Sequence, residues 1–174
     1  MRFGGPPQLR GVRKTDVPRI AELDTIAFQT GSLPRSALDI LYDVSGAYWV
    51  LAEDAEGIWG HSVNARGEDP RVGWIVGMAV HPARQRRGWG HVLLAGTIDR
   101  LHAADIDVIR LLVKPTNEVA RRMCVNFGFT DTGGRVDHFG TGEDRVVMSL
   151  LLPQSTAALP RIAGAAEPGE PYYL

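Results

Sequence analysis

Apolar residues recur along this chain at two different spacings, and the order of the two spacings predicts a mixed fold. Apolar positions three and four residues apart predict helices over residues 17–28, 35–42 and 88–104, and a further helix that begins after Asn117. Alternating or continuous apolar runs predict strands, which in chain order are residues 9–13, 47–53, 58–65, 72–80, 108–113 and 145–152. The three central strands suit an antiparallel meander, whereas the strand, helix and strand that follow imply a parallel crossover. We therefore expect an α/β fold with a mixed sheet.

Residues with special backbone preferences mark the boundaries of these elements. We expect residues 15–16 to cap the first helix, and Pro34 suits the first turn of the second because it lacks only an N–H group that would be unpaired there. Residues 54–57 form a good hairpin connection. Asn117 can cap the last helix, and Gly128 can end it in a left-handed conformation.

Length and composition place these elements in one domain. The 174 residues are 44% hydrophobic, which is enough for a single buried core over residues 1–152. Residues 153–174 are rich in proline, glycine and alanine and offer little to bury, so we expect a flexible C-terminal tail.

Charge and cysteine content narrow the classes of partner and compartment. Nineteen basic and 20 acidic side chains give a net charge of −1, which argues against nucleic acid or a membrane surface as a partner. The single cysteine, Cys124, cannot form an internal disulfide, and no apolar run approaches the roughly 20 residues that span a bilayer. We expect a cytoplasmic protein that needs no metal.

The turn between the strand at 72–80 and the helix that follows it has the features of a phosphate-binding loop. Gly88 and Gly90 let the backbone bend and approach a ligand closely, and the start of the helix offers unpaired N–H groups with a positive dipole end. His91 lies in the first helical turn. Three arginines add positive charge beside the turn: Arg84, Arg86 and Arg87. A diphosphate would fit this loop, although a glycine turn alone is a weak signal.

Three further signals occur in register with the predicted elements. The four together are Met78-Ala79-Val80 before His81-Pro82, the turn from Gln85 to Gly90, Asn117 with Ala120 three residues on, and Gly128-Phe129. In this arrangement the chain resembles the GNAT superfamily of acyl-CoA-dependent N-acetyltransferases over roughly residues 8–152. The resemblance implies a mostly antiparallel, splayed sheet flanked by about four helices.

The resemblance also implies which residues bind acetyl-CoA, the acyl donor. Met78 and Val80 would hydrogen-bond the pantetheine arm through their backbones, because the arm mimics an extra strand where the sheet splays. Trp89, expected to be exposed in the turn, could cover the cofactor, and Asn117 either contacts the pantetheine or only caps its helix. The full set expected at the cofactor is Met78, Ala79, Val80, Gln85, Arg86, Arg87, Gly88, Trp89, Gly90, His91 and Asn117.

The chain departs from the family pattern at the two positions that carry proton transfer. Many members have a tyrosine seven residues after the asparagine to protonate the leaving thiolate, and this chain has Cys124 there. Cys124 is either a general acid or a small buried hydrophobic residue, and we favour the second interpretation. Members that acetylate ribosomal-protein N-termini carry a glutamate five residues before the asparagine, where this chain has Leu112.

A general base therefore has no assigned position. An amine must be neutral to attack a thioester, so an ordinary lysine substrate would need such a base. The ionisable side chains near the expected acceptor site, which the sequence does not rank, are Glu22, Asp24, Glu68, Asp69, Asp137, His138, Glu143 and Asp144.

These observations predict an N-acetyltransferase in which a bound primary amine attacks the thioester of acetyl-CoA directly. We expect a small-molecule amine such as a metabolite or antibiotic, with specificity set by residues 28–48 and 131–144. The alternatives are a protein N-terminal or lysine acetyltransferase, and a non-catalytic acyl-CoA-binding domain. A homodimer is compatible with the resemblance, which is an analogy only.

Overall fold

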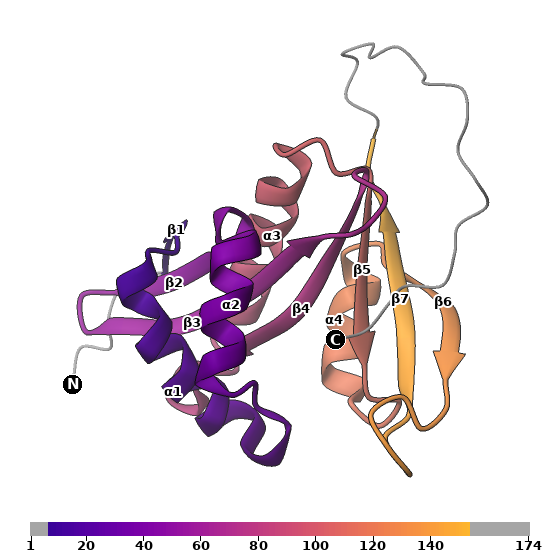
Figure 1. The fold of residues 1–174 in the computed structure, drawn as a ribbon, viewed down its shortest axis with the longest axis horizontal. Helices are drawn as coiled ribbons and strands as arrows, with labels where there is room; N and C mark the ends of the chain where they lie inside the picture. Colours follow the sequence, from indigo (N-terminus) through magenta and orange to yellow (C-terminus); the bar gives the residue numbers. More distant parts are fainter. Residues whose placement is uncertain (1–6, 154–174) are drawn as a thin grey trace.

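The computed structural model describes residues 7–153, and these residues form one seven-stranded sheet with helices on both faces (Figure 1). The strand order is β1-β2-β3-β4-β5-β7-β6, and each neighbouring pair is antiparallel except β4 and β5. The strands are β1 (Gln8–Gly11), β2 (Val50–Asp54), β3 (Gly57–Arg66), β4 (Val72–Val80), β5 (Val108–Val113), β6 (Thr130–Arg135) and β7 (Arg145–Leu151). The predicted mixed, mostly antiparallel sheet is confirmed.

The four α-helices divide between the two faces of the sheet. They are α1 (Val17–Phe28), α2 (Arg35–Ser45), α3 (Trp89–His102) and α4 (Glu118–Asn126). On one face α1 and α2 bury Ile20 and Leu38 against Trp49, Leu51 and Val63. On the other face α3 and α4 pack on the remaining core, where the buried side chains include Leu94, Leu101, Ile109, Leu111, Cys124 and Met148. In the described residues no helix lies in front of β5, β7 and β6 on the α1 side (Figure 1).

The sheet opens between β4 and β5. The two strands pair only between Val72–Ile75 and residues 108–111, after which β5 continues to pair with β7. The register of β3 with β4 shifts because Val63 lies opposite Gly77 and Asn64 lies opposite Ile75, which leaves Val76 as the extra residue of a β-bulge. A bulge bends its strand, so Val76 marks the point where β4 turns away from β5. The divergence is visible in Figure 1.

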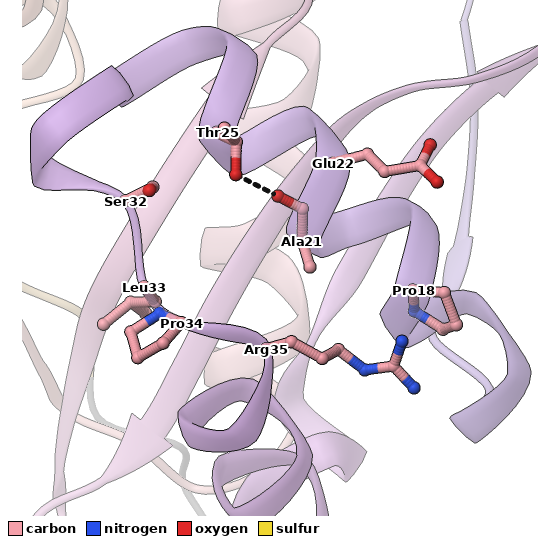
Figure 2. A pocket seen from close by; sticks show the side chains of 8 residues that line it. All are labelled: Pro18, Ala21, Glu22, Thr25, Ser32, Leu33, Pro34 and Arg35. Carbon is pink, nitrogen blue, oxygen red and sulfur yellow. Dashed lines mark hydrogen bonds between the residues drawn. The ribbon is translucent and has the colours of Figure 1, made fainter.

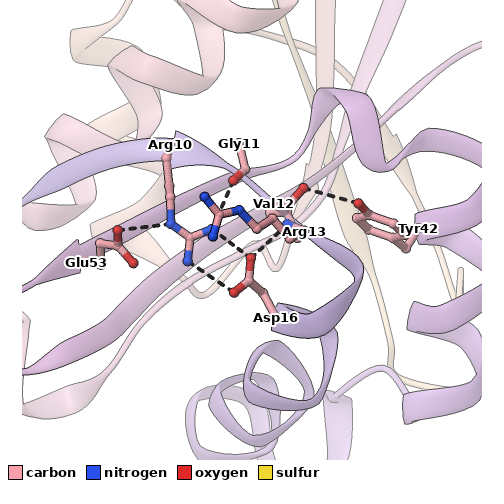
Figure 3. A network of polar contacts seen from close by, with 7 residues as sticks. All are labelled: Arg10, Gly11, Val12, Arg13, Asp16, Tyr42 and Glu53. Carbon is pink, nitrogen blue, oxygen red and sulfur yellow. Dashed lines mark hydrogen bonds and ion pairs between the residues drawn. The ribbon is translucent and has the colours of Figure 1, made fainter.

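A network around Arg10 holds the first strand and the first helix together (Figure 3). The Arg10 guanidinium donates to Glu53 of β2 at 3.0 Å and to Asp16 at 2.7 Å. Asp16 also accepts from the backbone N–H of Arg13 at 2.7 Å, in the short 3₁₀ turn Lys14–Asp16 that precedes α1. Asp16 is the N-cap residue of α1, as expected, but its carboxylate makes no capping bond to α1 because it is engaged in this turn.

Two other expectations differ from the structure near α2. The second strand begins at Val50 rather than at residue 47, because Gly46–Tyr48 forms a 3₁₀ turn that carries the chain from α2 to the sheet. Pro34 is the extended residue before α2, one position earlier than expected.

The C-terminal tail predicted for residues 153–174 lies, from residue 154 onward, outside the described residues. No helix in the described part of the chain has the length and apolarity that crossing a membrane requires.

Candidate acyl-CoA site

The first component of the site is the free edge of β4. Beyond Ile75, the backbone groups of β4 that point away from β3 have no strand beside them. Met78 and Val80 lie on this segment, with side chains that pack against the core of Val50, Ala52, Trp89 and Leu93 under α3. Because those side chains are occupied, what the segment offers a ligand is its main chain, as a missing neighbouring strand would use it.

The second component is the turn that enters α3. Arg86 and Gly88 both adopt left-handed backbone conformations, with φ of 59° and 81°. The first bond inside the helix runs from the N–H of Val92 to the carbonyl of Gly88 at 3.0 Å, and no side chain caps the helix. The N–H groups of Trp89, Gly90 and His91 therefore precede the first internal bond of the helix. Such a turn with a helix N-terminus is suited to an anion.

Space at Gly88 fits a ligand that approaches the backbone. A Cβ atom built on Gly88 would meet nothing within 4 Å. Gly90 is more crowded, because its Cβ would lie 3.4 Å from the Sδ atom of Met123 on α4. Close approach of α4 at this point brings His91 beside Phe127, with ring centroids 5.9 Å apart. The turn is thus closed on the α4 side and open at Gly88.

Two side chains of the turn contribute to structure, which the sequence did not indicate. Trp89 is only 4% exposed and belongs to the core beneath α3, so the expectation that it is exposed and covers the cofactor is wrong. An indole of this size stabilises the fold most when it is buried, and the first helical turn points it toward the sheet. Gln85 donates from Nε2 to the Val80 carbonyl at 2.9 Å, which ties the turn to the end of β4.

Arg84 is the second residue of the turn whose surroundings differ from the expectation. The sequence placed its charge beside the phosphate loop, but its side chain is buried, contacts Asp54 and Glu56 of the β2–β3 hairpin, and stacks 4.2 Å from the centre of the Trp59 ring. Although burial raises the pKa of Asp54, hydrogen bonds from the Glu56 N–H, Arg84 and Trp59 Nε1 hold it below its usual value. Arg84 therefore anchors the turn to the hairpin, whereas Arg86 and Arg87 are exposed.

Asn117 is the cap that the sequence predicted for α4. Its Oδ1 accepts from the N–H of Ala120 at 3.1 Å, and Gly128 ends the helix with φ of 92°. This capping explains the residue locally, and a contact with the pantetheine stays a prediction.

Comparisons with known proteins agree with this arrangement. Residues 17–129 match the model of the Acetyltransferase (GNAT) family, which is more than half of the chain. The chain belongs to this GNAT family.

Two curated GNAT relatives resemble part of the chain. The [Ribosomal protein bS18]-alanine N-acetyltransferase of Haemophilus ducreyi is 30% identical over 82 residues, which cover 45% of this chain and 57% of that protein. The mycothiol acetyltransferase of Beutenbergia cavernae is 32% identical over 82 residues, which cover 47% of this chain and 28% of that protein. The chain thus matches about half of the first relative and about a quarter of the second.

Solved structures share the fold at lower identity. Ard1 from Thermoplasma volcanium aligns with a TM-score of 0.78 and 16% identity, covering 86% of this chain and all of that one. The putative acetyltransferase yncA from Salmonella typhimurium, solved with its cofactor acetyl-CoA, aligns with a TM-score of 0.73 and 20% identity, covering 88% of this chain and 98% of that one. Arabidopsis thaliana Naa50, in complex with the bisubstrate analogue CoA-Ac-MVNAL, aligns with a TM-score of 0.72 and 21% identity, covering 84% of this chain and 99% of that one.

Cys124 occupies the position where many GNAT proteins have tyrosine, and the structure buries it. The side chain is 3% exposed in the core beneath α4, and burial raises the pKa of the thiol to about 11. Such a thiol is fully protonated at neutral pH but is a weaker acid than an ordinary cysteine. This environment favours the interpretation of Cys124 as a small hydrophobic residue.

Three of the candidate bases hold the β6–β7 connection in place. In the β6–β7 connection, Asp137 accepts from the Gly142 N–H at 2.6 Å, Asp144 accepts from the Asp137 N–H at 2.9 Å, and Glu143 pairs with Arg145 at 2.8 Å. Glu22 pairs with Arg19 on the exposed side of α1. Glu68 and Asp69 are exposed in the loop before β4, and His138 lies beside Phe139 with ring centroids 4.4 Å apart.

Asp24 differs from these candidates because its carboxylate is buried. Asp24 is a residue of α1 and is only 2% exposed. Its Oδ2 accepts from the Leu33 N–H at 2.7 Å, and its Oδ1 lies 3.4 Å from Nε2 of His61. His61, which is fully buried in β3, is not among the site residues predicted from the sequence. The available signal was an ionisable residue in the interior of a predicted strand.

A hollow of about 360 Å³ lies between α1 and the start of α2 (Figure 2). It includes part of the segment 28–48 that we expected to set acceptor specificity, and Leu33 connects it to Asp24. Its lining residues are Pro18, Ala21, Glu22, Thr25, Ser32, Leu33, Pro34 and Arg35.

Proposed function

We propose that this protein is an acetyl-CoA-dependent N-acetyltransferase. The observation that carries the proposal is the pairing of an unpartnered β4 edge with an uncapped, left-handed turn at the start of α3. The edge suits an extended amide chain, and the turn suits a diphosphate. Acetyl-CoA contains both groups in one molecule, in that order from the thioester. Membership of the GNAT family supports the same donor.

In this proposal the backbone from Met78 to Val80 binds the pantetheine arm, and the N–H groups of residues 86–91 bind the diphosphate. A backbone N–H near Val80 polarises the thioester carbonyl, where negative charge develops during attack. The amine attacks directly, without a covalent enzyme intermediate. Holding amine and thioester in contact supplies much of the acceleration.

We infer that the acceptor is a small-molecule primary amine. Leu112 alternates with the buried Leu111 and Val113, so it belongs to the face of β5 on the α1 side, and it provides no carboxylate there. Cys124 is likewise buried in apolar surroundings. The general-acid position of many family members and the glutamate position associated with ribosomal-protein acetylation are therefore both altered in this chain.

The α-amine of a protein is the second candidate acceptor. It is favoured by the name of the Haemophilus ducreyi relative, an alanine N-acetyltransferase of a ribosomal protein. An α-amine with a pKa near 8 is neutral in roughly one molecule in ten at pH 7, which lowers the demand for a base.

The proposal is tested by titrating the purified protein with acetyl-CoA and with CoA in a calorimeter, followed by a thiol-release screen on the same sample. The screen contains small amines and peptides with a free N-terminal alanine. Thiol release with small amines supports the first acceptor class, and release with peptides alone supports the second. Donor binding with no release indicates a non-catalytic acyl-CoA-binding domain, and absence of binding contradicts the site itself.

A further inference from the structure

His61 is a buried imidazole whose ring nitrogens have no hydrogen bond. It is 0% exposed, and among the described residues neither Nδ1 nor Nε2 has a hydrogen-bond partner. The nearest acceptor to Nε2 is Oδ1 of Asp24, at a contact distance of 3.4 Å. Buried polar atoms nearly always have partners, so an unpaired ring nitrogen calls for a bound water or a function.

The position of His61 connects it to the proposed reaction site. In the sheet it lies opposite Leu51 of β2 and Ala79 of β4, and these positions share the face covered by α1. Ala79 belongs to the segment of β4 that has no β5 partner. In the sheet register the residue between His61 and the open edge is therefore Ala79, whose side chain is a single methyl group. At Gly77, two residues earlier, a Cβ would meet nothing within 4 Å.

Asp24 gives the imidazole a defined orientation. Its Oδ2 is bound to the Leu33 N–H at 2.7 Å, which fixes the carboxylate and leaves Oδ1 toward His61. A carboxylate on one ring nitrogen favours the tautomer with hydrogen on that nitrogen and leaves the other as a proton acceptor. Among the described residues, Asp24 is the charged group in ion-pair contact with the ring, and the sheet neighbours Leu51 and Ala79 are apolar.

We propose that His61 is the proton acceptor for the attacking amine, with Asp24 as its positioning residue. This inference rests on the proposed function and names the base that the altered Leu112 position lacks. A water molecule carries the proton from the amine to Nδ1, since the imidazole itself is sealed from solvent in this structure. The histidine and aspartate pairing is the arrangement that makes an imidazole an effective base.

The step balances in atoms and charge. The bound ammonium loses one proton through water to Nδ1, and the neutral nitrogen then forms a bond to the thioester carbonyl carbon. The carbon–sulfur bond breaks, the sulfur leaves with the electron pair, and a second proton passes from the nitrogen through water to the thiolate. His61 returns its proton to solvent, so that the products are one amide, one thiol and one proton.

The test compares His61→Gln with wild type across pH, using an acceptor from the screen whose amine pKa is near 8. Gln keeps a polar side chain but cannot accept and return the proton. We expect kcat/KM to fall by about 100-fold or more at pH 6.5, which is typical for loss of a general base. The deficit should shrink as pH rises past 8, because the solvent then deprotonates the amine. Acetyl-CoA affinity should stay unchanged.

Val63→Ala is the matched control, because Val63 is buried on the same strand and belongs to the same α1-side core. Val63→Ala should lower the midpoint of thermal unfolding. The ratio of its kcat/KM to that of wild type should stay constant with pH. Asp24→Asn should reproduce the pH-dependent deficit in a milder form. A constant deficit for His61→Gln across pH, or none, overturns this inference while leaving the transferase intact. A wild-type protein that acetylates no amine overturns the proposed function and this inference with it.

Discussion

At the scale of single residues, two arginines two positions apart have different surroundings. Arg84 is buried between Asp54, Glu56 and the Trp59 ring, whereas Arg86 is exposed in a left-handed conformation next to the proposed diphosphate position. Both look alike in the sequence as positive charge beside a glycine turn. Their contacts assign them different roles, Arg84 to the stability of the turn and Arg86 to ligand binding.

Arg84→Met should therefore destabilise the fold, because it leaves the buried Asp54 carboxylate without its cation. We expect the midpoint of thermal unfolding to fall by more than about 5 °C. Arg86→Met is the control in the same turn, and it should leave the unfolding midpoint unchanged while weakening CoA binding, most clearly at low salt. Equal midpoints for the two variants would contradict the bracing role of Arg84.

Cys124→Ala should leave catalysis nearly intact. The thiol lies in the core, and its raised pKa of about 11 makes it a poor proton donor to a leaving thiolate. We expect kcat within about twofold of wild type, with a loss of about 1 kcal/mol in the free energy of unfolding. Native protein should also resist alkylation by iodoacetamide at pH 8. A tenfold loss of kcat with unchanged acetyl-CoA affinity would restore Cys124 as a general acid.

At the scale of elements, the site depends on a strand that changes its partner and a helix that begins without a cap. The bulge at Val76 turns β4 away from β5, and Gly88 supplies a left-handed residue with no side chain to fill the space before α3. Both features are departures from regular structure. Each leaves backbone groups unpaired at the place where the proposed ligand needs them.

Gly88→Glu should abolish acetyl-CoA binding while the fold survives. The new Cβ meets no atom, so the cost to the fold is the left-handed φ of 81°, about 1–2 kcal/mol. The carboxylate would repel the diphosphate, and we expect affinity to fall by at least about 100-fold in titration calorimetry. Gly142→Glu is the matched control, because Gly142 has φ of 79° and equal open space but lies in the β6–β7 connection. Retained affinity in Gly88→Glu would mean that the diphosphate binds elsewhere.

The sequence predicted most elements because their signals are local. Periodicity located β4, β5 and the helices, and Asn117 and Gly128 marked both ends of α4. Prediction from the sequence failed where the conformation or burial of a residue depended on tertiary contacts. Residues 47–49 are apolar enough for a strand, but the chain must turn there to leave α2. Whether Trp89 faces solvent or core depends on the sheet beneath it, which no spacing reveals.

At the scale of the whole molecule, ionisable groups that pair or lose solvent on folding determine the response to acid. Asp16 has a pKa lowered from 3.8, chiefly by its hydrogen bond from Arg10, and hydrogen bonds also lower that of Asp54 despite its burial. Burial, with Arg19 and Arg84 nearby, lowers the pKa of His81 from 6.5. In each case the unfolded chain binds protons more readily than the folded one.

Stability should therefore fall as pH decreases, first below about 6.5 as His81 in the unfolded chain becomes protonated, and more steeply below 4. Thermal unfolding monitored by circular dichroism between pH 8 and pH 3 measures this. His81→Gln should reduce the shallow upper part of the decline and leave the steep part, and His138 accounts for the remainder of the upper part because burial also lowers its pKa from 6.5. A midpoint that stays constant from pH 7 to pH 4 would contradict these assignments.

The strand order also has a consequence for how the chain matures on the ribosome. Among the strands that the structure describes, β7 is the last to be synthesised, yet it lies between β5 and β6. Until residues 145–151 emerge, β5 is attached to the nascent sheet only by its short ladder to β4, and both β5 and β6 present open edges. The strands β1 to β4 can pair with one another early, whereas β5 and β6 can be joined in the sheet only after β7 has been synthesised. Release of a truncated chain before this point would expose strands prone to intermolecular pairing.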